Sequence, residues 1–149
     1  MNESTEQKKI LIVEDDLPLR SVLTEKFTIE GFQVLEAVDG EEGLTIANKE
    51  HPNLIVLDIF MPRMDGISMM SRLREANSWG KHVPIVVLTN STDATTIYKV
   101  TGLGASDFLI KSEWSLDDLV EKIRARLNDS EQPKLDLNEA APKESGIVL

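Results

Sequence analysis

Five short apolar stretches recur along the chain, and longer amphipathic segments separate them. The first, third and fourth stretches are uninterrupted aliphatic runs, which are typical of strands buried on both faces of a parallel sheet. The second stretch is mixed, and the fifth is a short run bounded by polar residues. The five predicted strands cover residues 10–13, 32–37, 54–57, 84–88 and 107–110.

The segments that follow these stretches carry apolar residues at the spacing of a helix. Pro18 is a favoured first-turn residue, Asp39 can cap a helix and Gly31 can end one. Ser115 and Asp118 form a pattern like a capping box before the last segment. Five helices are predicted on these signals, beginning near residues 18, 40, 65, 93 and 115.

Because strands alternate with helices, the sequence predicts a parallel sheet with right-handed helical crossovers and helices packed around it. The periodic pattern ends near residue 128. We therefore expect a single domain over residues 9–128, a disordered N-terminus over residues 1–8, and a flexible acidic tail over residues 129–149.

Charge and composition then narrow the class of function. The net charge is −10, and an acidic chain lacks the Lys and Arg clusters that nucleic-acid phosphates require, so we expect no direct DNA binding. The absence of cysteine excludes a disulfide scaffold and a thiolate metal site. No apolar run approaches the roughly 20 residues that span a bilayer. The polar N-terminus has no signal-peptide core, so we expect a cytoplasmic protein without a membrane segment.

Polar side chains follow four of the predicted strands. Glu14 and Asp15 follow the first strand, Asp58 the third, Thr89 the fourth and Lys111 the fifth. Ligands of open α/β sheets bind outside the carboxyl ends of the strands, so these side chains should meet at one edge.

The chemistry of this set is specific. Clustered carboxylates repel one another unless a cation compensates them, and Mg²⁺ is held by carboxylates together with phosphate oxygens. An ammonium and a hydroxyl suit phosphate oxygens, and a carboxylate can itself become an aspartyl phosphate. The set therefore predicts Mg²⁺-assisted phosphoryl transfer to a carboxylate.

The segments that carry these residues resemble the receiver domains of bacterial response regulators. They are ILIVEDD, LIVLDIFMPRMDG, IVVLTN and DFLIKS. The resemblance implies a flavodoxin-like (βα)5 fold, a doubly wound parallel sheet with strand order 2-1-3-4-5. It also implies a sensor histidine kinase or a phosphotransfer protein as the phosphodonor, and a phosphoacceptor signalling protein rather than an enzyme. Without an output domain after residue 128, we expect a stand-alone receiver.

By position, the resemblance makes Asp58 the phosphoacceptor and Asp15 a direct Mg²⁺ ligand. Glu14 matches the acidic neighbour that reaches the metal through water, which leaves Asp16 outside the pair. Phe60 matches the residue whose backbone carbonyl binds the metal.

The resemblance also implies a switch. Thr89 matches the hydroxyl that turns toward the phosphoryl group, and Lys111 matches the ammonium that pairs with it. Phe108 falls where an aromatic ring changes rotamer as Thr89 moves. This switch would remodel the face formed by the fourth helix, fifth strand and fifth helix for an unknown downstream partner, a phosphorelay or a phosphorylation-dependent homodimer.

Several positions depart from the family pattern. Ser112 follows Lys111 where a cis proline is usual, and a cis non-proline bond costs about 2.5–4 kcal/mol, so a trans loop could displace Lys111. Asn90 stands where a small residue is usual. Phe60 and Ser91 flank the place where polar side chains can hold an attacking water, so we expect slow intrinsic dephosphorylation.

Other functions fit parts of the pattern. A receiver-like module that is not phosphorylated is supported only by Ser112 and Asn90. A phosphohydrolase of the haloacid-dehalogenase kind needs a second Asp two residues after the nucleophile, where this chain has Phe60. No glycine-rich nucleotide motif follows a strand. Trp114 either covers part of the output face or anchors the last helix, and both interpretations remain open.

Overall fold

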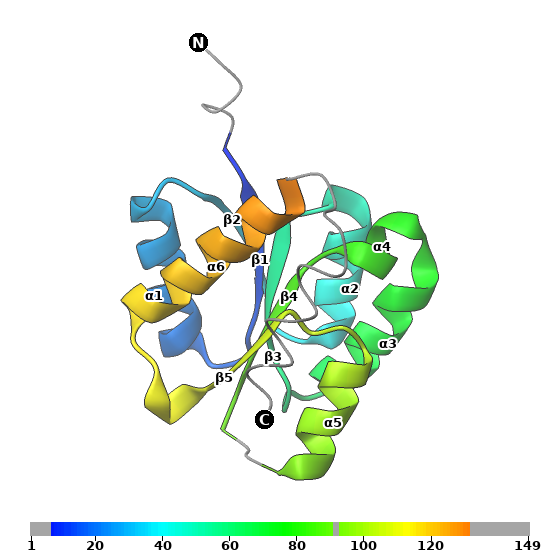
Figure 1. Ribbon diagram of the computed structural model, residues 1–149. Helices are drawn as coiled ribbons and strands as arrows, with labels where there is room; N and C mark the ends of the chain where they lie inside the picture. Colours follow the sequence, from blue (N-terminus) through cyan, green and yellow to red (C-terminus); the bar gives the residue numbers. More distant parts are fainter. Residues whose placement is uncertain (1–6, 91–92, 132–149) are drawn as a thin grey trace, which may run out of the picture.

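The computed structural model describes residues 7–90 and 93–131, which form a three-layer α/β sandwich (Figure 1). All strand pairs in the central sheet are parallel, in the order β2-β1-β3-β4-β5. This order confirms the predicted fold. The strands are β1 (Lys9–Val13), β2 (Gln33–Ala37), β3 (Leu54–Asp58), β4 (Ile85–Thr89) and β5 (Asp107–Ile110).

Helices cover both faces of the sheet. One face packs against α1 (Leu17–Ile29) and α6 (Leu116–Glu131), which lie on the left in Figure 1. The other face packs against α2 (Gly40–Glu50), α3 (Gly66–Ala76) and α5 (Ala94–Gly102).

The sheet is buried on both sides, which explains the uninterrupted apolar runs. Alternate residues of a strand point to opposite faces, so Ile10 and Ile12 join the core under α1 and α6. Leu11 and Val13 join the core under α2 and α3. Trp114 is partly buried and packs against the α1–α6 core, which supports its interpretation as an anchor of the last helix.

Side-chain caps begin the helices where the sequence signals predicted. Asp39 Oδ1 accepts from the backbone N–H of Glu42 at 2.9 Å. Ser115 and Asp118 exchange side-chain to backbone hydrogen bonds of 3.1 and 3.2 Å, so the predicted capping box is present. The other capping aspartates of long helices are Asp16, Asp65 and Asp93.

The strand ends agree with the prediction to within one residue, but other parts differ. Residues 7 and 8 of the predicted disordered N-terminus are described by the structure, and the Lys8 carbonyl accepts from Gln33 N–H at 2.9 Å. A short helix, α4 (Ser78–His82), lies between α3 and β4, where no helix was predicted. Asn77 caps it by accepting from Gly80 N–H at 2.7 Å. The last helix continues to Glu131 rather than ending near residue 128. The remainder of the predicted tail and residues 1–6 lie outside the described residues. None of the helices described has the length and apolar character needed to cross a bilayer.

Candidate functional site

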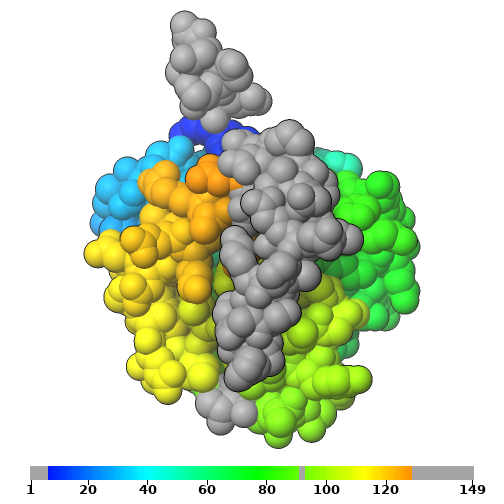
Figure 2. Space-filling model, viewed as in Figure 1, coloured from blue at the N-terminus to red at the C-terminus, as the bar shows by residue number. Residues whose placement is uncertain are grey.

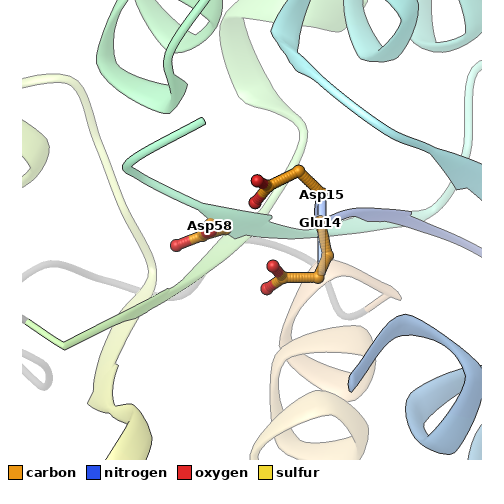
Figure 3. Close-up of side chains that lie close together, drawn as sticks. All are labelled: Glu14, Asp15 and Asp58. Carbon is orange, nitrogen blue, oxygen red and sulfur yellow. The ribbon is translucent and has the colours of Figure 1, made fainter. Parts of the chain in front are cut away.

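Three acids from two strand ends meet at the carboxyl edge of the sheet (Figure 3). Glu14 and Asp15 follow β1, and Asp58 ends β3. One carboxylate oxygen from each lies within 4.8 Å of the other two. Glu14 and Asp58 are buried, whereas Asp15 is exposed. Beside them lies a pocket of about 400 Å³, which Phe60 and Asn90 also line.

The loop after β1 is held by Arg20 of α1. Its Nη1 donates to the Glu14 carbonyl at 2.8 Å, and its Nε donates to Glu36 Oε1 of β2 at 2.9 Å. The neighbouring Asp16 has another role, because its carboxylate accepts from Leu19 N–H at 3.0 Å and so caps α1. The fold therefore uses one acid as a helix cap and directs the two before it toward Asp58.

Lys111 reaches the acids from the end of β5. Its Nζ lies 3.1 Å from Glu14 Oε1 and 3.4 Å from Asp58 Oδ1, and its side chain is 17% exposed. No peptide bond among the described residues is cis, so the link from Lys111 to Ser112 is trans. A 3-10 turn, Lys111–Glu113, begins directly at this residue. The absence of a cis proline therefore does not separate the ammonium from the carboxylates.

One ammonium leaves the cluster with excess negative charge. Burial and the charge of Glu14 raise the pKa of Asp58 to about 7, although Lys111 acts in the opposite direction. Burial lowers the pKa of Lys111, but Asp58 and Glu14 together raise it above its usual value. A hard divalent cation with oxygen ligands would compensate this charge, so the donor set fits Mg²⁺.

The remaining predicted residues lie around this cluster. Thr89 ends β4 and is fully buried. Phe108 of β5 pairs with Val87 in the sheet and is partly buried against the α2–α3 core. Asn90 is exposed and lines the same pocket as Asp58. The other predicted tuning residue, Ser91, lies outside the described residues.

Sequence reasoning did not single out Arg63. It lies in the β3–α3 loop (residues 59–65), which leads from Asp58 to α3, and its φ of 64° is left-handed. Its Nε donates to Asp39 Oδ2 at 2.5 Å, across 24 positions of sequence. Asp39 was predicted only as a cap. No local signal marks this pairing, because it depends on how two loops approach each other.

The family comparison agrees with this geometry. The response regulator receiver domain family matches residues 10–124. A probable transcriptional regulator, ycf27, of Cyanophora paradoxa is 40% identical over 131 residues, which cover 87% of this chain and 52% of that protein. The DNA-binding response regulator MtrA of Mycobacterium tuberculosis is 35% identical over 133 residues, 88% of this chain and 56% of that protein. The chain thus spans about half the length of these curated relatives.

Solved structures give the same result. A CheY-like receiver domain protein from Methanospirillum hungatei has a TM-score of 0.79 and 26% identity, covering 85% of this chain and 98% of that one. A CheX–CheY–BeF3–Mg²⁺ complex from Borrelia burgdorferi has a TM-score of 0.74 and 26% identity, covering 84% and 93%. The matched family, the strand order and these neighbours agree, and the chain belongs to the response regulator receiver domains.

Proposed function

We propose that this receiver domain is a phosphorylation switch in which Asp58 accepts a phosphoryl group from a sensor histidine kinase or a phosphotransfer protein. The observation that carries the proposal is the meeting of Glu14, Asp15 and Asp58 with Lys111 at one sheet edge. Membership in the receiver family supports it, and one structural neighbour was solved with BeF3 and Mg²⁺.

Each side chain has a separate part in the transfer. A carboxylate oxygen of Asp58 forms a bond to phosphorus while the bond from phosphorus to the donor nitrogen breaks, and that electron pair returns to the donor. The Lys111 ammonium, 3.4 Å from Asp58 Oδ1, and the Thr89 hydroxyl would bind the transferred oxygens. Glu14, Asp15, Asp58 and the Phe60 carbonyl would hold Mg²⁺, which supplies charge neutralisation.

The output would pass from Thr89 through Phe108 to the face made by α5, β5 and α6. Figure 2 shows residues of α6 (yellow to orange, on the left) and of α5 (yellow-green, at the lower right), both on the surface that faces the viewer. A new set of contacts to phosphate can bias such a face between two arrangements. We propose that this face binds a partner protein, a second phosphotransfer protein or a second copy of the domain.

We also propose that these 149 residues do not bind DNA themselves and that they act in the cytoplasm. DNA binding is disfavoured by the net charge of −10, which opposes contact with nucleic-acid phosphates. DNA-binding relatives such as MtrA are longer than this chain, which covers 56% of MtrA. Because such relatives are longer, the expectation of a stand-alone receiver stays a prediction.

Intact-protein mass after incubation with acetyl phosphate and Mg²⁺ tests the phosphoacceptor. Wild type should gain one phosphoryl mass, and Asp58→Asn should gain none. A matched control is Asp16→Asn, because Asn caps a helix as well as Asp does and Asp16 is outside the cluster. That control should still be phosphorylated, and a chelator should abolish the gain. A folded wild type that gains no mass from acetyl phosphate or phosphoramidate would support the alternative of an unphosphorylated module.

The exposed ring at Phe60 leads to a prediction about the lifetime of the phosphorylated state. Phe60 is 58% exposed and lines the pocket beside Asp58, but its ring has no polar atom to orient an attacking water. Phe60→Asn should therefore hydrolyse its aspartyl phosphate several-fold faster than wild type, because an amide can hydrogen-bond that water. The decay of the phosphorylated mass after donor removal measures this rate. Equal decay rates in the two proteins would show that Phe60 does not control water.

A further inference from the structure

We propose that the Arg63–Asp39 ion pair is a positioning element of the metal site, because it fixes the β3–α3 loop that carries the Phe60 carbonyl. The inference rests on the proposed function, since it presupposes that Glu14, Asp15 and Asp58 bind a divalent cation. It adds two residues that contact neither the metal nor the phosphoryl group and act only through the loop.

The β3–α3 loop is tied at both ends by backbone hydrogen bonds. Gly66 N–H donates to the Ile59 carbonyl at 2.8 Å and closes the base of the loop. Gly40 N–H donates to the Met64 carbonyl at 2.9 Å and ties the far end to the start of α2. A Cβ on Gly40 would lie 2.4 Å from the Met64 carbonyl oxygen, so this close approach requires glycine.

The ion pair adds a side-chain tie next to the second of these bonds. Arg63 has a left-handed backbone, which non-glycine residues adopt uncommonly and which the surrounding contacts must maintain. Its partner, Asp39, is only 3% exposed and is also fixed as the cap of α2 through Glu42 N–H. The pair therefore connects a loop residue in an uncommon conformation to a buried group at a rigid helix end.

Phe60 lies between the two ties and is itself an exposed residue, so its side chain does not anchor it in the core. Met61 and Met64 pack partly against the core, so the loop should remain folded when the ion pair is removed. What changes is the fine position of the Phe60 carbonyl. Mg²⁺ requires near-ideal octahedral geometry, so a small displacement of one ligand weakens binding.

The sign of the effect distinguishes positioning from simple electrostatics. Arg63→Gln removes a positive charge from the loop that leads away from Asp58, and Coulomb interaction alone would make cation binding equal or tighter. Loss of the tie should instead make binding about tenfold weaker, the effect typical of lost outer contacts to metal ligands. Arg72→Gln is the matched control, because Arg72 is an exposed arginine on the adjacent helix α3. It should bind cation as tightly as wild type or slightly more tightly.

The experiment uses Mn²⁺ as the probe and measures its free concentration by electron paramagnetic resonance during titration of each protein. A second variant combines Asp39→Asn with Arg63→Gln. It keeps the net charge of wild type and a competent helix cap, so its weakening reports the tie alone. Arg63→Lys keeps a cation near Asp39 and should retain most of the affinity. Thermal melts should show that every variant is folded.

The possible results separate the two proposals. Weaker Mn²⁺ binding by Arg63→Gln and by the double variant, with Arg72→Gln binding no more weakly than wild type, would establish the positioning role. Equal or tighter binding by Arg63→Gln would overturn it while leaving the metal site intact. If wild type itself binds no Mn²⁺, the metal site and the proposed function both fail, and the positioning role fails with them.

Discussion

Replacing Arg74 with methionine should lower the free energy of unfolding by about 3–5 kcal/mol. The guanidinium of Arg74, on α3, donates to four backbone carbonyls at 2.8–2.9 Å. Methionine would fill much of the same volume and leave these acceptors without their donor. The four carbonyls belong to Gly80, Val83, Leu103 and Gly104.

These carbonyls lie where helices end. Gly80 and Val83 are at the C-terminal end of α4, and Leu103 and Gly104 follow α5. The last carbonyls of a helix have no partner within it and carry the negative end of the helix dipole. One half-buried guanidinium thus caps two helices at once. Burial lowers the pKa of Arg74, but an arginine remains charged at neutral pH.

Urea denaturation of three variants measures this effect. Arg72→Met makes the same chemical change on the same helix at an exposed position, and it should stay within about 0.5 kcal/mol of wild type. The stability of Arg74→Lys should be intermediate. A compact ammonium cannot reach all four carbonyls, which the planar guanidinium contacts through separate N–H groups. An Arg74→Met protein as stable as Arg72→Met would show that water replaces the guanidinium without loss.

Replacing Asp58 with asparagine should stabilise the metal-free protein by about 2–4 kcal/mol at pH above 7. Asp58 is 5% exposed and lies beside Glu14, so its charged form is unfavourable in the folded state. Lys111 offsets only part of this cost. The acids that suit the proposed chemistry therefore weaken the fold, and the neutral amide removes the repulsion while keeping the shape.

The pH dependence of this difference follows from the direction of the shift. The pKa of Asp58 is about 7 in the folded state and about 3.9 when the chain is unfolded. Between these values the folded protein holds a proton that the unfolded chain has lost, so stability falls as pH rises through this window. Above pH 7 the loss is complete. The advantage of Asp58→Asn should therefore grow from about pH 4 to pH 7 and then level off.

Thermal or urea unfolding with a chelator present measures this difference, from about pH 5.5 upward to stay clear of the isoelectric point of about 4.6. Added Mg²⁺ should stabilise wild type through binding to the folded state, and it should stabilise Asp58→Asn far less. A variant less stable than wild type without metal, or a difference that does not change with pH, would contradict the strained acidic cluster.

The sheet and the residues at its carboxyl edge could be predicted from the sequence. Runs such as Ile10–Val13 are apolar without interruption because both faces of the strands are covered, and this pattern is visible locally. Once the strands are known to be parallel, Asp58 and Lys111 must lie at the same edge. These two residues are more than 50 positions apart, yet their meeting could be predicted, because the carboxyl ends of parallel strands lie at the same edge of a sheet.

The contacts that hold the loops and helix ends could not be predicted from the sequence. The short helix α4 lacks the length that makes a helical period visible. Arg74 contacts Leu103 across 29 positions and Arg63 contacts Asp39 across 24, so neither pairing has a local pattern. The sequence also could not show whether Lys111 reaches Asp58 when the peptide bond after it is trans. The structure places the ammonium beside Asp58 with that bond trans. Periodicity fixes which face of an element is buried, whereas these contacts depend on the distance between elements, which packing alone sets.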